Sequence, residues 1–212
     1  MTEPEPSAAL PAAAQVLIVG GGVIGASVAY HLAKLGWRDV LLLEQSQIGA
    51  GTSWHAAGLI GRLRTTSSMT KINKYSAELY AGLEAETGHP IGWKQVGSLV
   101  LGKSEQRMIQ LRRTAAMAEI LGVEAHLAGP REAHDKWPLI RHDDLLGAVW
   151  LPHDGKLLPK ELALALAQGA RLHGAQVREV VRVSEILHQR GRAVGARTPQ
   201  GDIAADVVVL CG

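Results

Sequence analysis

Continuous runs of apolar residues mark three segments of this chain that are typical of strands buried on both faces of a sheet. The runs cover residues 16–20 (VLIVG), 39–44 (DVLLLE) and 206–210 (DVVVL). Strands of a parallel sheet carry such runs because other elements cover both faces, so neither face alternates with polar residues. The pattern therefore predicts an α/β fold with a parallel sheet.

The residues after the first run have the apolar spacing of a helix. Four of them recur every three or four positions and form the apolar stripe of this helix, and Gly36 supplies the stop. These four are Ile24, Val28, Leu32 and Leu35. Strand, helix and strand then fit between Val16 and Glu44, which is the length of one βαβ unit.

Further elements are expected along the rest of the chain. Helices are predicted at 70–88, 105–121 and 159–172, the last with Pro159 near its first turn, where a helix tolerates proline. A strand is predicted at 93–101, short irregular pieces at 123–152, and a hairpin-like stretch through Gly191 and Gly201. Strands and helices alternate in the order that an α/β domain requires.

Three glycines stand between the first predicted strand and its helix. Gly20, Gly22 and Gly25 have the spacing G-x-G-x-x-G, which permits a tight turn, a close approach to a pyrophosphate, and close packing of helix on strand. Glu44 ends the second strand about 20 residues later, where a carboxylate binds the ribose hydroxyls of an adenosine. Together these residues predict a dinucleotide site with the phosphates at the helix N-terminus.

The glycine loop and its acid serve NAD and FAD alike. A chain that binds NAD usually continues with further βα units, whereas here the small-residue run GAGTSWHAAG follows at 49–58. Small residues let the backbone lie along an extended cofactor, which favours FAD. An NAD-dependent or non-covalent FAD oxidoreductase stays open as an alternative.

Composition and charge narrow the class of protein. The net charge is +2 and no long basic block occurs, which gives no reason to expect nucleic acid as a partner. No apolar run approaches the ~18 residues of a membrane span, and the histidines lack metal-ligand spacing, so no metal site is predicted. The single cysteine, Cys211, fits a reducing compartment. Residues 1–14 lack the features of a secretory or mitochondrial leader, and we expect a disordered lead-in and a cytoplasmic protein.

From Val16 onward the chain resembles the start of the sarcosine and dimethylglycine dehydrogenases, which belong to the D-amino-acid-oxidase-like flavoproteins. The stretches that carry the resemblance are GGGVIGASVAYHLAKLGWRDVLLLEQSQIGAGTSWHAAGLIGRLR, ETGHPIGW, LGVEAH, DDLLGAVWLPHDG, GARLHGAQV and ADVVVLCG. The resemblance implies a doubly wound FAD-binding domain in two pieces, 15–88 and 153–212. Residues 89–152 would form the first part of an inserted, partly antiparallel substrate domain. Its second half would follow Gly212, so we expect a C-terminal truncation.

The resemblance also implies how the cofactor is held. In that family the histidine of the W-H-x-A-G-L motif carries the flavin covalently, and His55 within SWHAAGL matches it. A neutral imidazole nitrogen suits this bond, because it is a nucleophile able to attack the methyl carbon of the flavin's benzenoid ring. Val183 matches a strand-end residue whose backbone contacts the adenine. Cys211 and Gly212 match a small-residue turn beside the phosphates.

The reaction implied by the resemblance is the oxidation of an N-methylated or secondary amine such as sarcosine or dimethylglycine. Hydride passes to the flavin, the iminium product is hydrolysed or trapped by folate in a further domain, and the electrons go to oxygen or a carrier protein. Arg62 or Arg64 is a candidate for binding the substrate carboxylate, since arginine binds carboxylates bidentately, with ordinary surface arginines as the alternative. His153 and Asp154 receive no chemistry, because a turn accounts for them.

No general base is identified in these residues. The family includes the regulatory subunit of pyruvate dehydrogenase phosphatase, so a non-catalytic regulatory relative is a further alternative. We expect the 212 residues alone to be inactive, because the sheet and the substrate wall would be incomplete.

Overall fold

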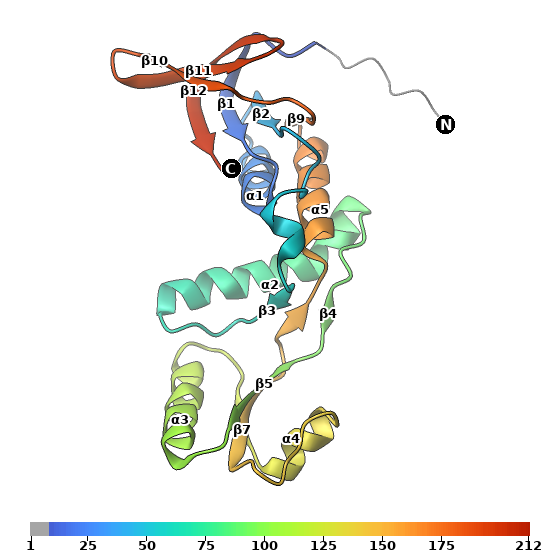
Figure 1. The fold of residues 1–212 in the computed structure, drawn as a ribbon, viewed down its shortest axis with the longest axis vertical. Coiled ribbons are helices and arrows are strands. Elements are labelled where there is room, and N and C mark those ends of the chain that lie inside the picture. Colours follow the sequence, from blue (N-terminus) through green and yellow to red (C-terminus); the bar gives the residue numbers. More distant parts are fainter. Residues whose placement is uncertain (1–8) are drawn as a thin grey trace. The chain divides into compact units, whose positions relative to one another are not determined.

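A computed structural model describes residues 9–212, so residues 1–8 of the expected lead-in lie outside the described residues (Figure 1). The chain divides into two compact units. Unit 1 comprises the described residues up to Ala57 together with Leu83–Ile91 and Leu158–Gly212, and unit 2 comprises Gly58–Gly82 and Gly92–Leu157. Among the described residues, no helix is both long and apolar enough to cross a membrane.

Unit 1 is built on a six-stranded sheet in the order β10-β11-β12-β1-β2-β9. Its parallel strands are β1 (Ala13–Val19), β2 (Val40–Leu43), β9 (Gln176–Arg178) and β12 (Gly201–Leu210), and β10 (Glu185–Gln189) and β11 (Arg192–Thr198) join antiparallel. The three apolar runs of the sequence lie side by side, since Val16 pairs with both Val40 and Val207. The α/β class and the parallel sheet are confirmed. Strand β1 begins at Ala13, inside the lead-in that was expected to reach residue 14.

Both faces of the parallel strands are buried, by different elements. Leu17 of β1 and Leu41 of β2 join an apolar cluster with Ile203 of β12 and residues of β10 and β11. Ile18 and Leu42 are also buried and, by strand alternation, point to the opposite face. That face is covered by helix, because α1 contacts β1, β2 and helix α5 (Figure 1). The apolar runs are therefore explained by a helical layer on one side and a β-meander on the other.

Helix α1 (Val23–Lys34) packs through its small residues rather than through the expected apolar stripe. Its buried residues include Ala26, Ala29 and Ala33, together with Tyr30. Two residues of the expected stripe, Ile24 and Leu35, are 65% and 76% exposed, so that expectation was wrong. The expected helix itself is confirmed.

The reason is the close approach of helix α5 (Pro159–Leu172), whose buried residues are also mostly alanine. A Cβ built on Gly169 of α5 would lie 2.7 Å from the Tyr30 ring. Larger side chains at this crossing would force the two helices apart. The expected helix at 159–172 has the observed bounds of α5.

Unit 2 contains two small antiparallel sheets. One has the order β5-β7-β6 and the other β3-β8-β4. The strands are β3 (Leu59–Ile60), β4 (Lys94–Gln95), β5 (Ser98–Gly102), β6 (His126–Ala128), β7 (Gly147–Leu151) and β8 (Gly155–Lys156). Helix α3 (Glu105–Ile120) packs Met108 and Leu111 against β7, and a short helix, α4 (Pro130–Lys136), contacts the same strand. The antiparallel pairing agrees with the expected inserted domain.

The strand expected at 93–101 is interrupted between β4 and β5. Gly97 there adopts φ +72, and a Cβ on it would lie 1.8 Å from the Trp150 ring. This left-handed residue bends the chain away from an extended path, which an apolar pattern alone does not reveal.

The units do not follow the expected boundaries of 15–88 with 153–212, and 89–152. Residues 58–82 belong to unit 2 because β3 pairs with β8, Asn73 donates to the Gly61 carbonyl at 3.1 Å, and Lys74 donates to the Gly122 carbonyl at 2.9 Å. Helix α2 (Ser67–Thr87), expected at 70–88, contributes its last residues, from Leu83, to unit 1.

Candidate functional site

The turn between β1 and α1 is closed by glycines whose side-chain space is already filled. Gly20 adopts φ +109, and a Cβ there would lie 2.8 Å from the backbone of Cys211 and of Gly212. A Cβ on Gly25 would lie 1.8 Å from the carbonyl oxygen of Gly20. Any side chain at these positions would push α1 away from β1 and the end of β12. The structure therefore brings Gly20, Gly25 and Gly212 together.

The N-terminus of α1 is open to an anion. Its N-cap is Gly22, which has no side chain to bond the free amides of the first turn. The amide of Val23 instead donates to Ser53 Oγ at 2.9 Å, from the 3-10 helix η1 (Thr52–His55). Ser53 accepts this bond, so its hydroxyl hydrogen stays available for an anionic oxygen. The helix dipole and the remaining amides favour a phosphate here.

Ser53 carries no motif that would single it out in the sequence. The available signal was a hydroxyl residue inside the small-residue run 49–58, two positions before His55. Its partner, the Val23 amide, lies 30 residues earlier in the chain, so only the folded structure joins them.

Glu44 follows β2, and both of its carboxylate oxygens accept backbone amides. The Gly21 amide donates to Oε2 at 2.6 Å, and the Ser46 amide donates to Oε1 at 2.8 Å. Glu44 thus connects the glycine turn with the loop after β2. A carboxylate has about four acceptor sites, so Glu44 can also accept hydroxyl groups of a ligand.

The segment after β9 lies beside Glu44. The Val181 amide donates to the Glu44 carbonyl at 2.8 Å, and the Val180 amide donates to the Ser46 carbonyl at 3.0 Å. Val180 has φ +60, which is rare for a β-branched residue, and its side chain is exposed. Val183 follows, half-buried against the apolar cluster that contains Leu17 and Val181. The structure therefore places Val183 in the segment that borders Glu44.

His55 ends η1 and is exposed. Its ring centroid lies 3.9 Å from that of Trp54, with the planes tilted by 36°. Among the described residues, no other side chain forms a hydrogen bond, an ion pair or a ring contact with this imidazole. The segment of His55 is held against the glycine turn by Ser53, two residues earlier, which accepts a hydrogen bond from the first amide of α1.

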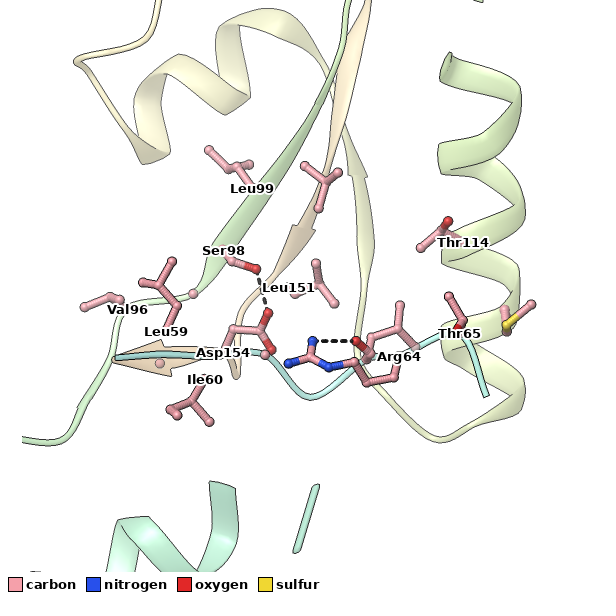
Figure 2. A pocket seen from close by; sticks show the side chains of 16 residues that line it. Leu59, Ile60, Arg64, Thr65, Val96, Ser98, Leu99, Thr114, Leu151 and Asp154 are labelled. Atoms are coloured by element: carbon pink, nitrogen blue, oxygen red, sulfur yellow. Dashed lines mark hydrogen bonds between the residues drawn. The ribbon is translucent and has the colours of Figure 1, made fainter. Parts of the chain in front are cut away.

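Unit 2 contains a cavity of about 660 Å³ with a mainly apolar lining (Figure 2). Its polar residues include Arg64, Ser98 and Asp154. Asp154 is only 6% exposed. Its Oδ1 accepts the Arg62 amide at 2.8 Å, and its Oδ2 accepts the Ser98 hydroxyl at 2.6 Å. A buried acid thus holds together two segments of the cavity wall.

The two candidate arginines are placed differently. Arg64 lines the cavity, and its Nη1 donates to the Leu63 carbonyl at 3.1 Å, which leaves most of its donors open (Figure 2). Arg62 offers its amide to Asp154, and within the described residues its buried Nε has no hydrogen-bond partner. Asp154, to which the sequence assigned only a turn, is a structural acid. Its partners lie 92 and 56 residues away, so no local signal could have shown this.

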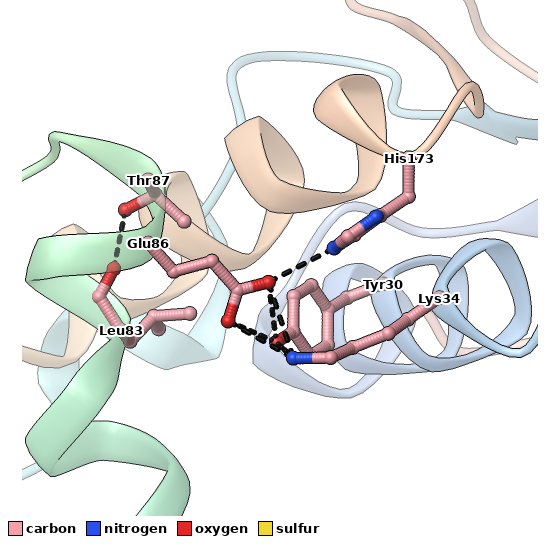
Figure 3. A network of polar contacts seen from close by, with 6 residues as sticks. All are labelled: Tyr30, Lys34, Leu83, Glu86, Thr87 and His173. Carbon is pink, nitrogen blue, oxygen red and sulfur yellow. Dashed lines mark hydrogen bonds and ion pairs between the residues drawn. The ribbon is translucent and has the colours of Figure 1, made fainter.

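A second acid of unit 1, Glu86 of α2, is held by side chains (Figure 3). Tyr30 donates to it at 2.8 Å, Lys34 at 2.9 Å and His173 Nε2 at 2.9 Å. Burial raises the pKa of Glu86, but these hydrogen bonds outweigh it and lower the pKa to about 2. Glu86 joins the end of α2 to α1 and to the residue that follows α5.

Among the described residues, no group of three or more His, Cys, Asp or Glu is arranged to hold a metal ion.

The sequence of this chain is similar to parts of several longer proteins. It is 40% identical over 204 residues to 4-methylaminobutanoate oxidase (formaldehyde-forming) of Paenarthrobacter nicotinovorans, covering 96% of this chain and 25% of that protein. It is 36% identical over 212 residues to mitochondrial sarcosine dehydrogenase of Homo sapiens, covering 97% of this chain and 23% of that protein. It is 38% identical over 205 residues to the mitochondrial pyruvate dehydrogenase phosphatase regulatory subunit of Mus musculus, covering 97% of this chain and 23% of that protein. The chain spans about a quarter of the length of these relatives.

Solved structures agree on the fold. L-proline dehydrogenase from P. horikoshii matches with a TM-score of 0.89 and 29% identity, over 95% of this chain and 53% of that chain. Glycine oxidase from Geobacillus kaustophilus matches with a TM-score of 0.80 and 31% identity, over 95% and 56%. The family model described as FAD dependent oxidoreductase matches residues 15–212. The chain therefore belongs to the DAO family of FAD-dependent oxidoreductases.

Proposed function

We propose that the protein carrying this chain oxidises an N-methylated or secondary amine, such as sarcosine or dimethylglycine, with covalently bound FAD. The observation that carries the proposal is the glycine turn of unit 1 with His55 tied to it through Ser53. The 4-methylaminobutanoate oxidase and sarcosine dehydrogenase relatives support the substrate class.

The residues of unit 1 fit FAD. Gly20 and Gly25 leave no space for a side chain, so the backbone and the open N-terminus of α1 would receive the pyrophosphate. Glu44 would accept the ribose hydroxyls, and the segments of Val183 and Gly212 would lie against the adenosine part and the phosphates. Bound FAD supplies the acceptor for the two electrons of the amine's C–H bond.

The chain's own residues would bind and orient. His55 is exposed and has no polar partner among the described residues, so an imidazole nitrogen is free to bond the flavin and fix it in one position. In unit 2, Arg64 would bind the carboxylate of the amino acid, because its guanidinium keeps free donors at the cavity wall. The apolar lining of that cavity suits a methylated amine.

Acid precipitation of the full-length protein, expressed with ample riboflavin, tests the covalent bond. We expect the yellow colour to stay with the pellet of the wild type and to pass to the supernatant in His55→Ala. Colour in the wild-type supernatant would reject the attachment but leave FAD binding intact. A protein that takes up no flavin would reject the whole proposal.

Anaerobic addition of substrate tests the reaction. Sarcosine, dimethylglycine or 4-methylaminobutanoate should bleach the flavin absorbance near the visible maximum, and Arg64→Ala should require a higher concentration of the same amine. A variant that bleaches at the wild-type concentration would remove Arg64 from the substrate site.

A second candidate function follows from the 38% identity to the phosphatase regulatory subunit. In that case the protein would bind FAD without oxidising an amine, and would act on a partner. The bleaching experiment separates the two: a yellow protein that none of these amines bleaches favours the regulatory function.

A further inference from the structure

The segment 61–64 carries Arg64 to the cavity wall of unit 2 but belongs to no helix or strand. Such a segment lacks the ladder of backbone hydrogen bonds of a regular element, so its amides and carbonyls need other partners. Four of these backbone groups are bound by three polar side chains of the same unit. These side chains are Thr70, Asn73 and Asp154.

Thr70 of α2 binds both backbone groups of Arg64. Its hydroxyl accepts the Arg64 amide at 3.0 Å and donates to the Arg64 carbonyl at 3.2 Å. Thr70 is only 1% exposed, although threonine is mostly found at the surface. One buried hydroxyl thus fixes the backbone from which the Arg64 side chain extends into the cavity wall.

Asn73 and Asp154 fix the residues before Arg64. Asn73 follows Thr70 by three positions, on the same face of α2, and donates to the Gly61 carbonyl at 3.1 Å. Asp154 accepts the Arg62 amide at 2.8 Å. The whole segment is therefore held by side chains from α2 and from the turn before β8.

Gly61 lets the Arg64 guanidinium approach this buried acid. A Cβ built on Gly61 would lie 3.0 Å from Arg64 Nη1 and 3.4 Å from Asp154 Oδ2, so both groups border the space that a side chain would fill (Figure 2). Their opposite charges attract one another at this short range. The attraction favours an Arg64 rotamer that stays at the cavity wall.

We propose that Thr70, supported by Asn73 and Asp154, is a positioning residue for the binding of a substrate carboxylate by Arg64. The proposal rests on the proposed function, in particular on the role of Arg64. Arginine has a long flexible side chain, and a fixed backbone limits the positions of its guanidinium before the substrate arrives. This pre-organisation favours amines that bear a carboxylate over amines that lack one.

The expected size follows from the bond that Arg64 makes. A hydrogen bond to a charged group corresponds to about 10- to 150-fold in affinity. Arg64 keeps its charge when Thr70 is changed, so a poorly placed guanidinium should lose only part of this factor, about 3- to 30-fold.

The test follows anaerobic bleaching of the flavin in the full-length protein. The substrate is the amine, among sarcosine, dimethylglycine and 4-methylaminobutanoate, that bleaches the wild type at the lowest concentration. Thr70→Val keeps the shape of the side chain without its hydroxyl, and should raise the amine concentration for the half-maximal bleaching rate about 3- to 30-fold. Thr70→Ser keeps the hydroxyl and should stay within about twofold of the wild type.

Thr198→Val is the matched control in unit 1. Thr198 is 5% exposed, and its hydroxyl also serves two backbone groups, donating to the Gly201 carbonyl at 2.8 Å and accepting the Gln200 amide at 3.1 Å. The substitution therefore removes an equivalent pair of hydrogen bonds far along the chain from Arg64. It should leave the half-maximal concentration at the wild-type value.

A double-mutant cycle separates positioning from a general structural role. In an Arg64→Ala background, Thr70→Val should change the half-maximal concentration by less than about twofold, because no guanidinium is left to position. The same increase in both backgrounds would overturn the proposal, and so would equal concentrations for wild type and Thr70→Val. If Thr70→Val does not fold, Asn73→Ala decides by the same cycle. A wild type that none of the three amines bleaches would reject the proposed function and, with it, any role of these residues in substrate binding.

Discussion

Unit 1 holds two carboxylates in opposite ways. Glu44 accepts two backbone amides, from Gly21 and Ser46, whereas Glu86 accepts three side chains, from Tyr30, Lys34 and His173. Backbone amides leave a carboxylate with acceptor sites that a ligand hydroxyl can use. Cationic and phenolic side chains that converge on one carboxylate instead bind helices to one another. We therefore propose a ligand-binding role for Glu44 and a structural role for Glu86, although both are glutamates near the ends of regular elements.

The largest effect is expected at the glycine turn itself. Gly25→Ala places a methyl group where 1.8 Å separates it from the Gly20 carbonyl, so α1 must shift away from β1. We expect FAD affinity to fall by more than about 100-fold and the free energy of unfolding to fall by about 1–3 kcal/mol. Calorimetric FAD titration and urea unfolding measure the two quantities.

The matched control is Gly82→Ala, at an exposed helical glycine with open space around its Cβ. It should keep FAD affinity and raise the free energy of unfolding by about 0.5–1 kcal/mol, because alanine favours helix. Equal behaviour of the two variants would contradict a close-packed glycine turn.

Substitution by glutamine should have different effects at Glu44 and at Glu86. In a His55→Ala background, where FAD binding is reversible, Glu44→Gln should weaken FAD binding about 10- to 150-fold, because a charged acceptor for the ribose is lost (about 1.5–3 kcal/mol). Glu86→Gln should leave FAD affinity unchanged and lower the free energy of unfolding at pH 7 by about 1–2 kcal/mol. A loss of affinity in Glu86→Gln that equals that in Glu44→Gln would abolish the distinction.

The contribution of Glu86 to the free energy of unfolding should decrease at acidic pH. Its pKa is lowered from 4.5 to about 2 in the folded protein, so its contribution is fully present above pH 4.5 and is lost as the pH falls toward 2. Urea unfolding between pH 6 and pH 3 should show a stability loss in wild type that Glu86→Gln reduces by about 1 kcal/mol. Parallel curves for the two proteins would mean that the Glu86 network adds little.

The smallest effect is expected at the edge of the same network. His173 contributes one hydrogen bond to Glu86 and its side chain is 34% exposed. His173→Ala should therefore lower the free energy of unfolding by only about 0.5 kcal/mol and leave FAD affinity unchanged. Thermal unfolding, compared with the change in Glu86→Gln, shows whether Tyr30 and Lys34 hold the acid without it.

Much of unit 1 could be predicted from the sequence. The apolar runs at 16–20, 39–44 and 206–210 specify buried parallel strands, because continuous apolar residues mark strands that are covered on both faces. The motif G-x-G-x-x-G followed by an acid specifies the glycine turn, because its contacts are made within one βαβ unit. The local pattern did not show which face of α1 is buried, because that face is set by a distant helix. Ile24 and Leu35 suggested a core, but the partner of α1 is α5, about 130 residues away, and only their alanines fit between the helices.

By itself, then, the sequence determined the main elements of unit 1, its parallel sheet and the glycine turn with Glu44, because these depend on local spacing and on hydrophobic periodicity. Only the tertiary structure decided which acid is structural and that Ser53 accepts the first amide of α1. It also decided that Asp154 is buried with hydrogen bonds from Arg62 and Ser98, and that residues 58–82 join unit 2. Each of these depends on a hydrogen bond or strand pairing between residues far apart in the chain. The partners of such a contact cannot be read from the local sequence, because they meet only when the chain folds.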